Sequence, residues 1–287
     1  MDFEQFFLAH EPAIRLICFL AVFATVALWE VAAPRRALTV SKALRWSSNL
    51  GLVALNTVLL RLTFPLAAAG IAAFGVANGW GLLNHFQVPF WLAVPVAVIA
   101  MDFVIWLQHV MVHAVPALWR LHQVHHADLD YDLTTGARFH PIEIALSMLI
   151  KFATITVLGP PVFAVVIFEV LLSATATFNH GNIRLPAAVD RVLRLLVVTP
   201  DMHRVHHSVE DDETNSNFGF NLPWWDRLFG TYRALPRSGH DAILIGIHGH
   251  SDPREVARLD GMLLMPFKGK VDGYAINRRH CSGESAS

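Results

Sequence analysis

Histidine is the residue type whose number and spacing in this sequence could do chemistry. The chain has 16 histidines in 287 residues. Two segments repeat the pattern His-x2-His-His, which places three imidazoles on one face of a helix. Ten histidines lie in the middle of the chain: His109, His113, His122, His125, His126, His140, His180, His203, His206 and His207. Packed together, these rings would repel one another as cations and would lack partners as neutral groups, whereas metal ions bind one nitrogen of each ring. Because so many ligands exceed the coordination of one ion, the pattern predicts two metal ions.

Two acidic residues are placed where they could support such a site. Asp102, His109 and His113 fall at i, i+7 and i+11, within about 40° of one another on a helix. Carboxylates inside membrane segments are functional by default, so we expect Asp102 to orient an imidazole N–H. Glu143 follows His140 and a proline, and it either orients a ring in the same way or stabilises the start of a helix.

The composition restricts both the class of protein and the type of metal site. The chain is 54% hydrophobic and 16% charged with a net charge of −1, which excludes a disordered chain and a polybasic nucleic-acid binder. Its two cysteines, Cys18 and Cys281, are too few for an iron–sulfur cluster or a disulfide framework. Imidazole suits Fe, Cu, Zn and Ni, and structural zinc usually has four ligands that include cysteine. An all-histidine cluster beside apolar segments therefore favours redox chemistry on a lipid.

Five apolar segments are expected to position the histidines at a membrane: 13–33, 49–76, 89–109, 144–158 and 162–178. The second is either one tilted helix or a helix followed by a re-entrant piece. A Gly-Pro-Pro turn joins the last two, which could form a hairpin. We therefore expect an all-α membrane bundle of four or five spans, with a cytosolic helical cap that carries the di-metal site. The whole chain, 1–287, is expected to be one membrane-embedded domain, with its last ten residues frayed.

Basic residues give this bundle a direction. Four Lys or Arg lie between the first two segments and several follow the last, whereas residues 77–88 contain none. The positive-inside rule then places the N-terminus outside and the C-terminus inside. With that orientation all ten histidines fall on the cytosolic face, although they come from four separate segments. We expect two membrane cations, Arg61 and Lys151, to pair or to extend toward the interface, without a catalytic role.

The order of these motifs resembles the fatty acid hydroxylase / sterol desaturase superfamily of membrane di-iron enzymes. The resemblance covers residues 102–232, and it rests on the histidine motifs at 118–126, 138–143, 179–182 and 199–208 and on a closing segment at 217–232. It implies two non-haem iron ions, O2 as co-substrate and a separate electron donor of cytochrome or ferredoxin type with its reductase. Within the closing segment, Trp225 and Asp226 are expected to pack and cap rather than to do chemistry.

The resemblance also implies a ligand set. Its members are His109, His113, His122, His125, His126, His203, His206 and His207, with His180 as a ninth ligand and His140 as a further candidate. The sequence departs from some members at Ala176, where a second histidine of the fifth segment would stand. That part of the site is therefore either one ligand short or completed by water.

Several functions remain open on the sequence. The short first His-x3-His pair favours hydroxylation of a lipid C–H bond over desaturation. A metal-binding or haem membrane protein without oxygenase activity is the alternative from another class. A zinc hydrolase would contain His-Glu-x-x-His, which the sequence does not have. The lipid, the donor and the oligomeric state are left undefined, and no nucleic-acid partner is expected.

Overall fold

The computed structural model describes residues 2–64, 66–268 and 276, and across these residues the chain is helical without a named strand. Two isolated bridges, Pro34 with Ile183 and Ser208 with Ile245, are its only extended pairings among the residues described. The predicted all-α class is confirmed, while Cys281 and the tail expected to be frayed lie outside the described residues. The elements are α1 (Phe3–Ala32), α2 (Lys42–Thr63), α3 (Ala68–Ala77), α4 (Leu82–His85), α5 (Phe90–Ala114), α6 (Pro116–His126), η1 (Thr135–Ala137), α7 (Pro141–Leu158), α8 (Val162–Asn179), α9 (Ala187–Leu193), α10 (Pro200–His206), α11 (Asp211–Thr214), α12 (Trp224–Leu228), α13 (Gly239–Ala242), α14 (Pro253–Val256), α15 (Leu259–Leu264) and η2 (Met265–Phe267).

Five helical segments are long and apolar enough to cross a membrane, as the sequence predicts: 3–32, 42–85, 90–114, 141–158 and 162–179. The first begins ten residues earlier than expected, because the Asp2 carboxylate caps it by accepting a hydrogen bond from the Gln5 N–H at 2.8 Å. The second segment consists of α2 and the separate short helices α3 and α4. It is therefore a helix followed by a shorter helical piece rather than one tilted helix.

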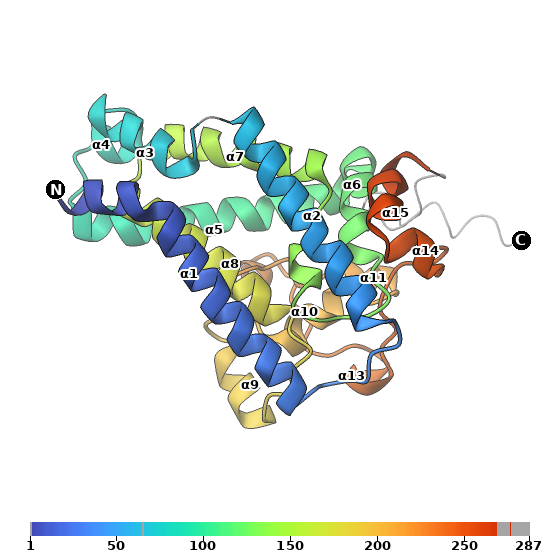
Figure 1. The fold of residues 1–287 in the computed structure, drawn as a ribbon. Coiled ribbons are helices and arrows are strands. Elements are labelled where there is room, and N and C mark those ends of the chain that lie inside the picture. Colours follow the sequence, from blue (N-terminus) through green and yellow to red (C-terminus); the bar gives the residue numbers. More distant parts are fainter. Residues whose placement is uncertain (1, 65, 269–275, 277–287) are drawn as a thin grey trace, which may run out of the picture.

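The membrane helices pack around small side chains. Figure 1 shows α1 lying along α8, with α5 beside them and α3 near the N-terminal end of the bundle. Ala68, Ala69 and Ala72 of α3 are buried, which lets the backbone approach α7 and α8 closely. These residues belong to one apolar core that includes Met101, Ile155 and Phe168 from the longer helices.

The turn between α7 and α8 is seated on the segment before α4. Gly159 has φ +66°, and a Cβ on Gly81 would lie 2.3 Å from the Gly159 nitrogen, so both positions require glycine. The Asn84 side-chain amide donates to the Gly159 carbonyl at 3.1 Å. This end of the bundle is remote from the histidine-bearing helices α6 and α10 (Figure 1).

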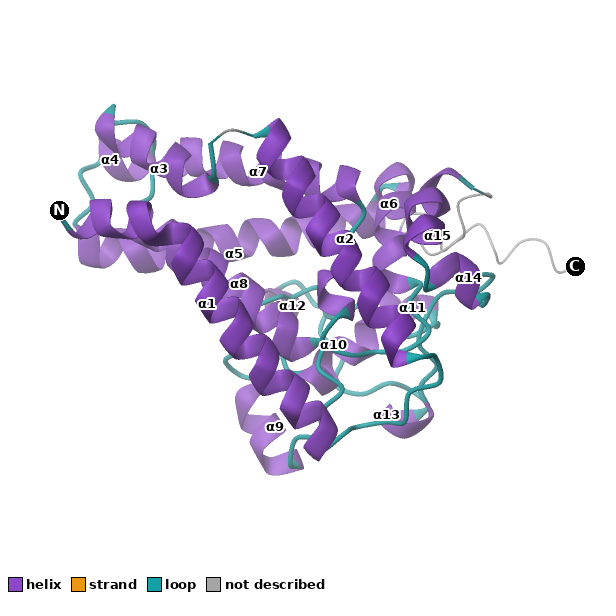
Figure 2. Ribbon diagram, in the orientation of Figure 1, coloured by secondary structure: helices purple, strands orange, loops and turns teal. Residues whose placement is uncertain are grey.

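The C-terminal part packs onto the same body. The loops and short helices from α9 to α15 gather at one end of the bundle (Figure 2). A second apolar core joins Leu52 of α2 and Trp119 of α6 to Val256, Met262 and Met265. The cap is therefore continuous with the bundle through α2 and α6.

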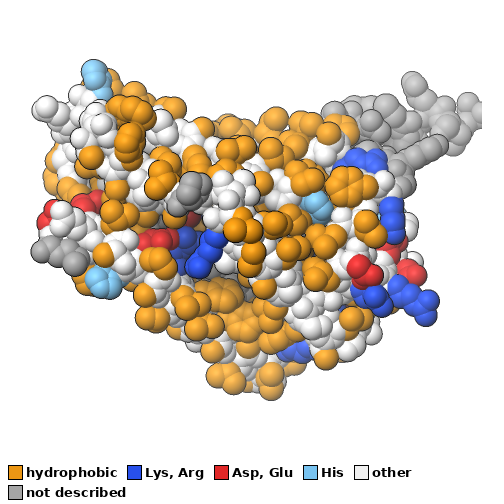
Figure 3. Space-filling model, turned by 45° about the horizontal axis from the view of Figure 1, so that its top comes forward, with side chains coloured by type: hydrophobic (Ala, Val, Ile, Leu, Met, Phe, Trp, Pro, Cys, Tyr) orange, Lys and Arg blue, Asp and Glu red, His pale blue; other side chains and the backbone are white. Residues whose placement is uncertain are grey.

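The outer faces of the long helices are apolar. Leu62 is 78% exposed, and Val31 and Trp91 are each 74% exposed. Figure 3 shows hydrophobic side chains over most of the face that it presents. Such a large exposed apolar surface fits contact with lipid, because apolar side chains are more stable beside lipid tails than in water.

Candidate metal centre

Nine of the ten predicted histidines meet in two buried groups. His109, His113, His122, His126 and His206 form one group, and His125, His180, His203 and His207 form the other. Within each group, the nitrogens that could serve as ligands all lie within 4.8 Å of one another. The rings come from the end of α5, from α6, from the residue that caps α8, and from α10 with the residue that follows it.

Helix spacing explains how two short helices fill both groups. On α6, His122 and His126 are one turn apart and face the first group, while His125 faces the second. Pro116 starts this helix at a position where proline is favoured. On α10, Thr199 caps the helix through its hydroxyl, which accepts from the Met202 N–H at 3.4 Å.

Backbone carbonyls fix the orientation of three rings. The Nδ1–H of His109 donates to the Phe218 carbonyl at 2.7 Å, and that of His206 donates to the Ser216 carbonyl at 2.7 Å. The Nδ1–H of His180 donates to the Ala176 carbonyl at 2.8 Å. Because a carbonyl only accepts, each neutral ring carries its hydrogen on Nδ1 and has a lone pair on Nε2.

Those lone pairs point at one another. The Nε2 atom of His109 lies 3.2 Å from the Nε2 of His122 and 3.0 Å from the Nε2 of His206. The Nδ1–H of His122 is committed to Glu143, at 2.7 Å from Oε1. Two facing acceptors are unfavourable unless a cation lies between them.

A proton is a poor candidate for that cation. Burial lowers the pKa of His206 well below its ordinary value, and it lowers the pKa of His180 to about 3. Burial and the neighbouring imidazoles have the same effect on the pKa of His125 and His207. Protonation of these four rings is therefore unfavourable, and divalent metal ions fit the arrangement better than protons.

Unsatisfied ring nitrogens point the same way. Both ring nitrogens of His126 and of His203 are buried without a hydrogen-bond partner among the described residues. The same holds for Nδ1 of His125 and of His207. Buried polar atoms without partners are costly and rare, and a metal ion would satisfy one nitrogen of each ring.

Glu143 lies beside the first group, in the first turn of α7. It contacts His122 as described, so it is placed to orient that ring. It also lies at the start of a helix, so both positions that the sequence suggested for Glu143 are met by the same side chain. Its second oxygen, Oε2, is buried and has no hydrogen-bond partner within the described structure. A carboxylate that receives the N–H of a ligand imidazole is typical of protein metal sites.

His140 lies outside both groups. Its Nδ1 accepts from the Ile142 N–H at 3.2 Å and so caps α7. Its Nε2 lies 3.3 Å from the Leu263 carbonyl. The ring is held between the start of α7 and the C-terminal segment, which turns it away from the other nine.

Asp102 contacts the closing segment instead of a histidine. Its Oδ2 accepts from the Trp225 indole N–H at 2.8 Å. The expected contact between Asp102 and an imidazole is not among the interactions of the described residues. Asp226, one residue on, accepts from the Phe218 and Gly219 N–H groups at 2.9 and 2.8 Å. Asp226 thus fixes the loop whose carbonyl orients His109.

No residue type in the sequence indicates the acceptors that hold His109 and His206, because both are backbone carbonyls. Asn215, whose side-chain oxygen lies 3.3 Å from Nδ1 of His113, was also missed. The available signal was the polar run Asn215, Ser216 and Asn217 where the closing segment begins, which is unusual beside an apolar bundle.

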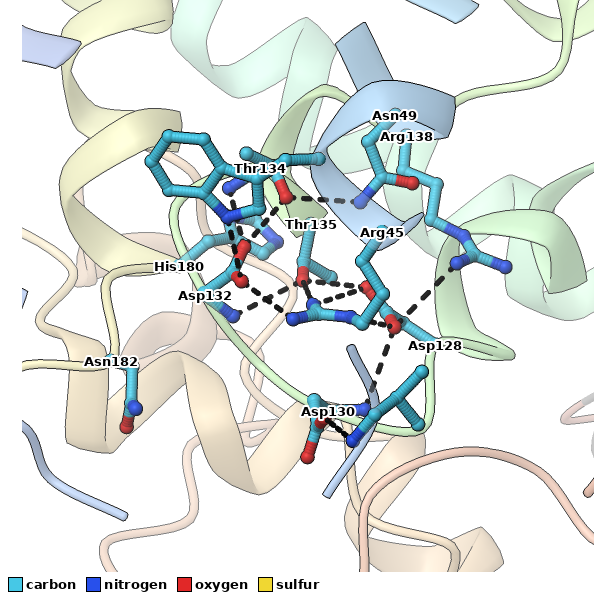
Figure 4. Close-up of polar contacts among 12 residues, drawn as sticks. Arg45, Asn49, Asp128, Asp130, Asp132, Thr134, Thr135, Arg138, His180 and Asn182 are labelled. Atoms are coloured by element: carbon cyan, nitrogen blue, oxygen red, sulfur yellow. Dashed lines mark hydrogen bonds and ion pairs between the residues drawn. The ribbon is translucent and has the colours of Figure 1, made fainter. Parts of the chain in front are cut away.

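A buried ionic network supports the loop after α6. Arg45 of α2 donates to both oxygens of Asp128, at 2.8 and 2.7 Å, and to Asp132 at 2.5 Å (Figure 4). Arg138 donates to the Val124 carbonyl at 2.6 Å. Burial alone raises the pKa of Asp128, but Arg45 and Arg138 outweigh it and hold that pKa well below its usual range. The network therefore anchors the chain directly after His126.

A cavity of about 230 Å³ opens beside the centre. His109, His122 and Glu143 line it, as do Gly136 and Ala176 near His180. The position at which the sequence departs from some relatives is thus occupied by cavity space rather than by a ring. The group that contains His180 has four histidines, against five in the other.

Comparisons with known proteins agree with this geometry. Residues 94–231 match the family model described as fatty acid hydroxylase. The chain is 28% identical over 190 residues to an ornithine lipid hydroxylase, OlsE, from Rhizobium tropici, covering 65% of this chain and 55% of that protein. It is 29% identical over 195 residues to an alkylglycerol monooxygenase from Xenopus tropicalis, covering 64% of this chain and 41% of that protein. The human alkylglycerol monooxygenase is 29% identical over 143 residues, covering 48% and 30%.

The chain spans about half or less of the length of these relatives. No solved structure matches it significantly. The matched region contains all nine clustered histidines, and it also contains Trp225 and Asp226 of the closing segment. The resemblance read from the histidine motifs is therefore confirmed, because residues 94–231 match the fatty acid hydroxylase family.

Proposed function

We propose that the protein is an O2-dependent di-iron oxidoreductase that hydroxylates a C–H bond of a membrane lipid. One observation supports it above the others: nine buried histidines form two groups beside a cavity that lies between apolar helices. The names of the relatives, a lipid hydroxylase and a monooxygenase, support hydroxylation over desaturation. The sterol- or acyl-type identity of the lipid is left to experiment.

The chain's own residues would perform four tasks. Five histidines would hold one iron and four the other, with water as an added ligand on the side of Ala176. Glu143 would keep the His122 lone pair pointed inward. The apolar part of the cavity, including Ile105, Val112 and Leu172, would hold the lipid and exclude bulk water. When bound, the two irons would supply the activation of O2 that an unactivated C–H bond requires.

The reaction needs an external reductant. One oxygen atom enters the product as an alcohol and the other leaves as water, which consumes two electrons and two protons. We propose a separate donor of cytochrome or ferredoxin type, with its reductase, that docks on the cytosolic side. The supporting feature is a set of basic residues near α10, a helix that carries ligand histidines. Arg35 lies 3.4 Å from Asp201 of that helix, and Arg184 lies 3.9 Å from Asp241.

Metal analysis of the purified protein tests the proposal. We expect about two irons per chain, and a sharp loss in His125→Ala. His85→Ala is the matched control, because His85 lies in the short helix α4, outside both groups. Reductant and O2 should then yield an oxidised lipid with wild type and not with His125→Ala.

The second candidate is a metal-binding membrane protein without oxygenase activity. Imidazole sets also hold zinc, so the ligands alone do not separate the two functions. Stoichiometric zinc after expression in iron-replete medium, together with no O2-dependent lipid product, would overturn the proposal. A Soret band from the purified protein would instead indicate haem.

A further inference from the structure

The cavity beside the metal centre continues into the membrane bundle and becomes polar again at its far end. His109, His122 and Glu143 line the end at the metal centre. Arg15 of α1, Lys151 of α7 and Glu169 of α8 line the same cavity deeper between the helices. Charged side chains inside apolar segments are expensive and usually mark a binding site or a pathway.

Two helices carry polar side chains along the cavity wall. On α7, Glu143, Ser147 and Lys151 line it at i, i+4 and i+8, so they form one stripe. On α8, Glu169 and Ser173 line it at i and i+4. Eight residues of helix separate Glu143 from Lys151, which corresponds to about 12 Å between the two ends.

The charges at the far end balance. Glu169 Oε1 accepts from Lys151 Nζ at 2.7 Å, and Glu169 Oε2 lies 3.1 Å from Arg15 Nη1. Arg15 also donates to Glu11 at 2.6 Å. Two cations and two carboxylates therefore form a neutral cluster.

This cluster keeps hydrogen-bonding capacity that the protein does not use. The Lys151 ammonium has three donors, and Glu169 is its one acceptor among the residues described. The Gln108 side-chain oxygen, on the same cavity wall, is buried without a partner in the described structure. The Arg15 side chain is 43% exposed, and Figure 3 shows basic and acidic side chains together beside a hollow that hydrophobic side chains flank. An ion pair that only holds helices together would not need unused hydrogen-bond donors that face a cavity.

We propose that the far end, formed by Arg15, Lys151 and Glu169, binds a polar group of the lipid substrate that has no net charge. An ester, an amide, a hydroxyl or a zwitterion has this chemistry. Because the cluster is already neutral, a ligand with net charge would leave an uncompensated charge in an apolar interior. The proposal rests on the proposed lipid oxidation, and it places the bound polar group about 12 Å along α7 from Glu143, at the opposite end of the cavity from the metal centre.

Binding of photoreactive lipids tests this without turnover. The purified, metal-loaded protein in lipid nanodiscs, kept free of reductant, is mixed with diazirine-bearing probes of equal chain length. The probes are a monoacylglycerol, a lysophosphatidylcholine, a fatty acid anion and a plain alkane. We expect crosslinks on α7 and α8 from the first two, with at least tenfold weaker labelling by the anion and the alkane. The two polar probes separate an uncharged group from a zwitterion.

The double variant Lys151→Met with Glu169→Gln removes one charge of each sign, so the remaining Arg15–Glu11 pair stays neutral. It should lower labelling by the polar probes at least tenfold while leaving the iron content unchanged. Arg61→Met is the matched control, since it removes a membrane cation outside the cavity lining. Wild type that labels equally with anion, alkane and polar probes would overturn the proposal, even if the variant fails to fold. So would a folded double variant that labels as wild type does. If wild type labels selectively with the polar probes but shows no O2-dependent oxidation of any lipid, the proposed function is refuted and the binding proposal is not.

Discussion

Individual hydrogen bonds decide which nitrogen of each ring is free for a metal. The sequence spacing of the histidines predicted that they would meet, and nine of them do. It did not predict the rotamer of His140, whose ring caps α7, because proximity in sequence to a motif says nothing about which way a side chain turns. Backbone acceptors such as the Phe218 carbonyl have no signature of their own, since every residue has that group.

Glu143→Leu should weaken metal binding about 10- to 100-fold, because His122 loses the carboxylate that orients its lone pair. Glu143→Gln keeps an acceptor oxygen and should retain much of the affinity. Titration with a competing chelator measures both. Equal affinities for wild type and Glu143→Leu would show that the contact does not support the metal site.

Gly136→Ala should displace the four-histidine group. A Cβ at this position would lie 2.8 Å from Nδ1 of His180 and 2.6 Å from the Ala176 carbonyl, so the hydrogen bond between them must shift. We expect about half of the bound metal to be lost. Gly70→Ala is the control, because its Cβ would meet a side chain at an ordinary 3.5 Å. Unchanged metal content in Gly136→Ala would contradict the expected geometry.

At the scale of helices, the sequence predicts the features that depend on local pattern and misses those that depend on tertiary contacts. Five long apolar runs and two His-x2-His-His repeats define the bundle and its two ligand helices, since both signals are local. The break in the second segment and the contact between Asp102 and Trp225 are tertiary, so periodicity could not reveal them. Arg45 is a similar case, because a basic residue at a membrane boundary looks like an orientation signal until its partners are seen.

Arg45→Met should destabilise the loop that follows α6. It would leave Asp132 buried without its cation and Asp128 with Arg138 alone, and breaking a buried ion pair in this way typically costs about 3–5 kcal/mol. Thermal unfolding in detergent should show a large drop in melting temperature together with loss of metal. Adding Asp132→Asn, which removes the carboxylate left unpaired, should recover part of the loss. A double variant less stable than Arg45→Met would argue against unpaired charge as the cause.

In the whole molecule, bound metal ions should link the membrane bundle to the cap, because their ligands come from both parts. The nine histidines come from the membrane helix α5, from the end of α8 and from the cap helices α6 and α10. A ligand that binds only the folded state stabilises it by about 2.7 kcal/mol at a free concentration one hundred times its Kd. Chelation should therefore lower the melting temperature, and ferrous iron should restore it.

Hydrogen exchange locates the effect. We expect α10 to lose protection first, because this helix of 7 residues carries two of the ligand histidines and is followed directly by a third, His207. The long helix α5 should stay protected, because it is held by the apolar core around Met101 and Ile105. His125→Ala should respond less to iron than wild type, whereas His85→Ala should respond fully. If chelation removes the metal but leaves both the melting temperature and α10 protection unchanged, the cap is held by its own packing, through contacts such as those of Trp119 and Met262, and metal binding is not coupled to the fold.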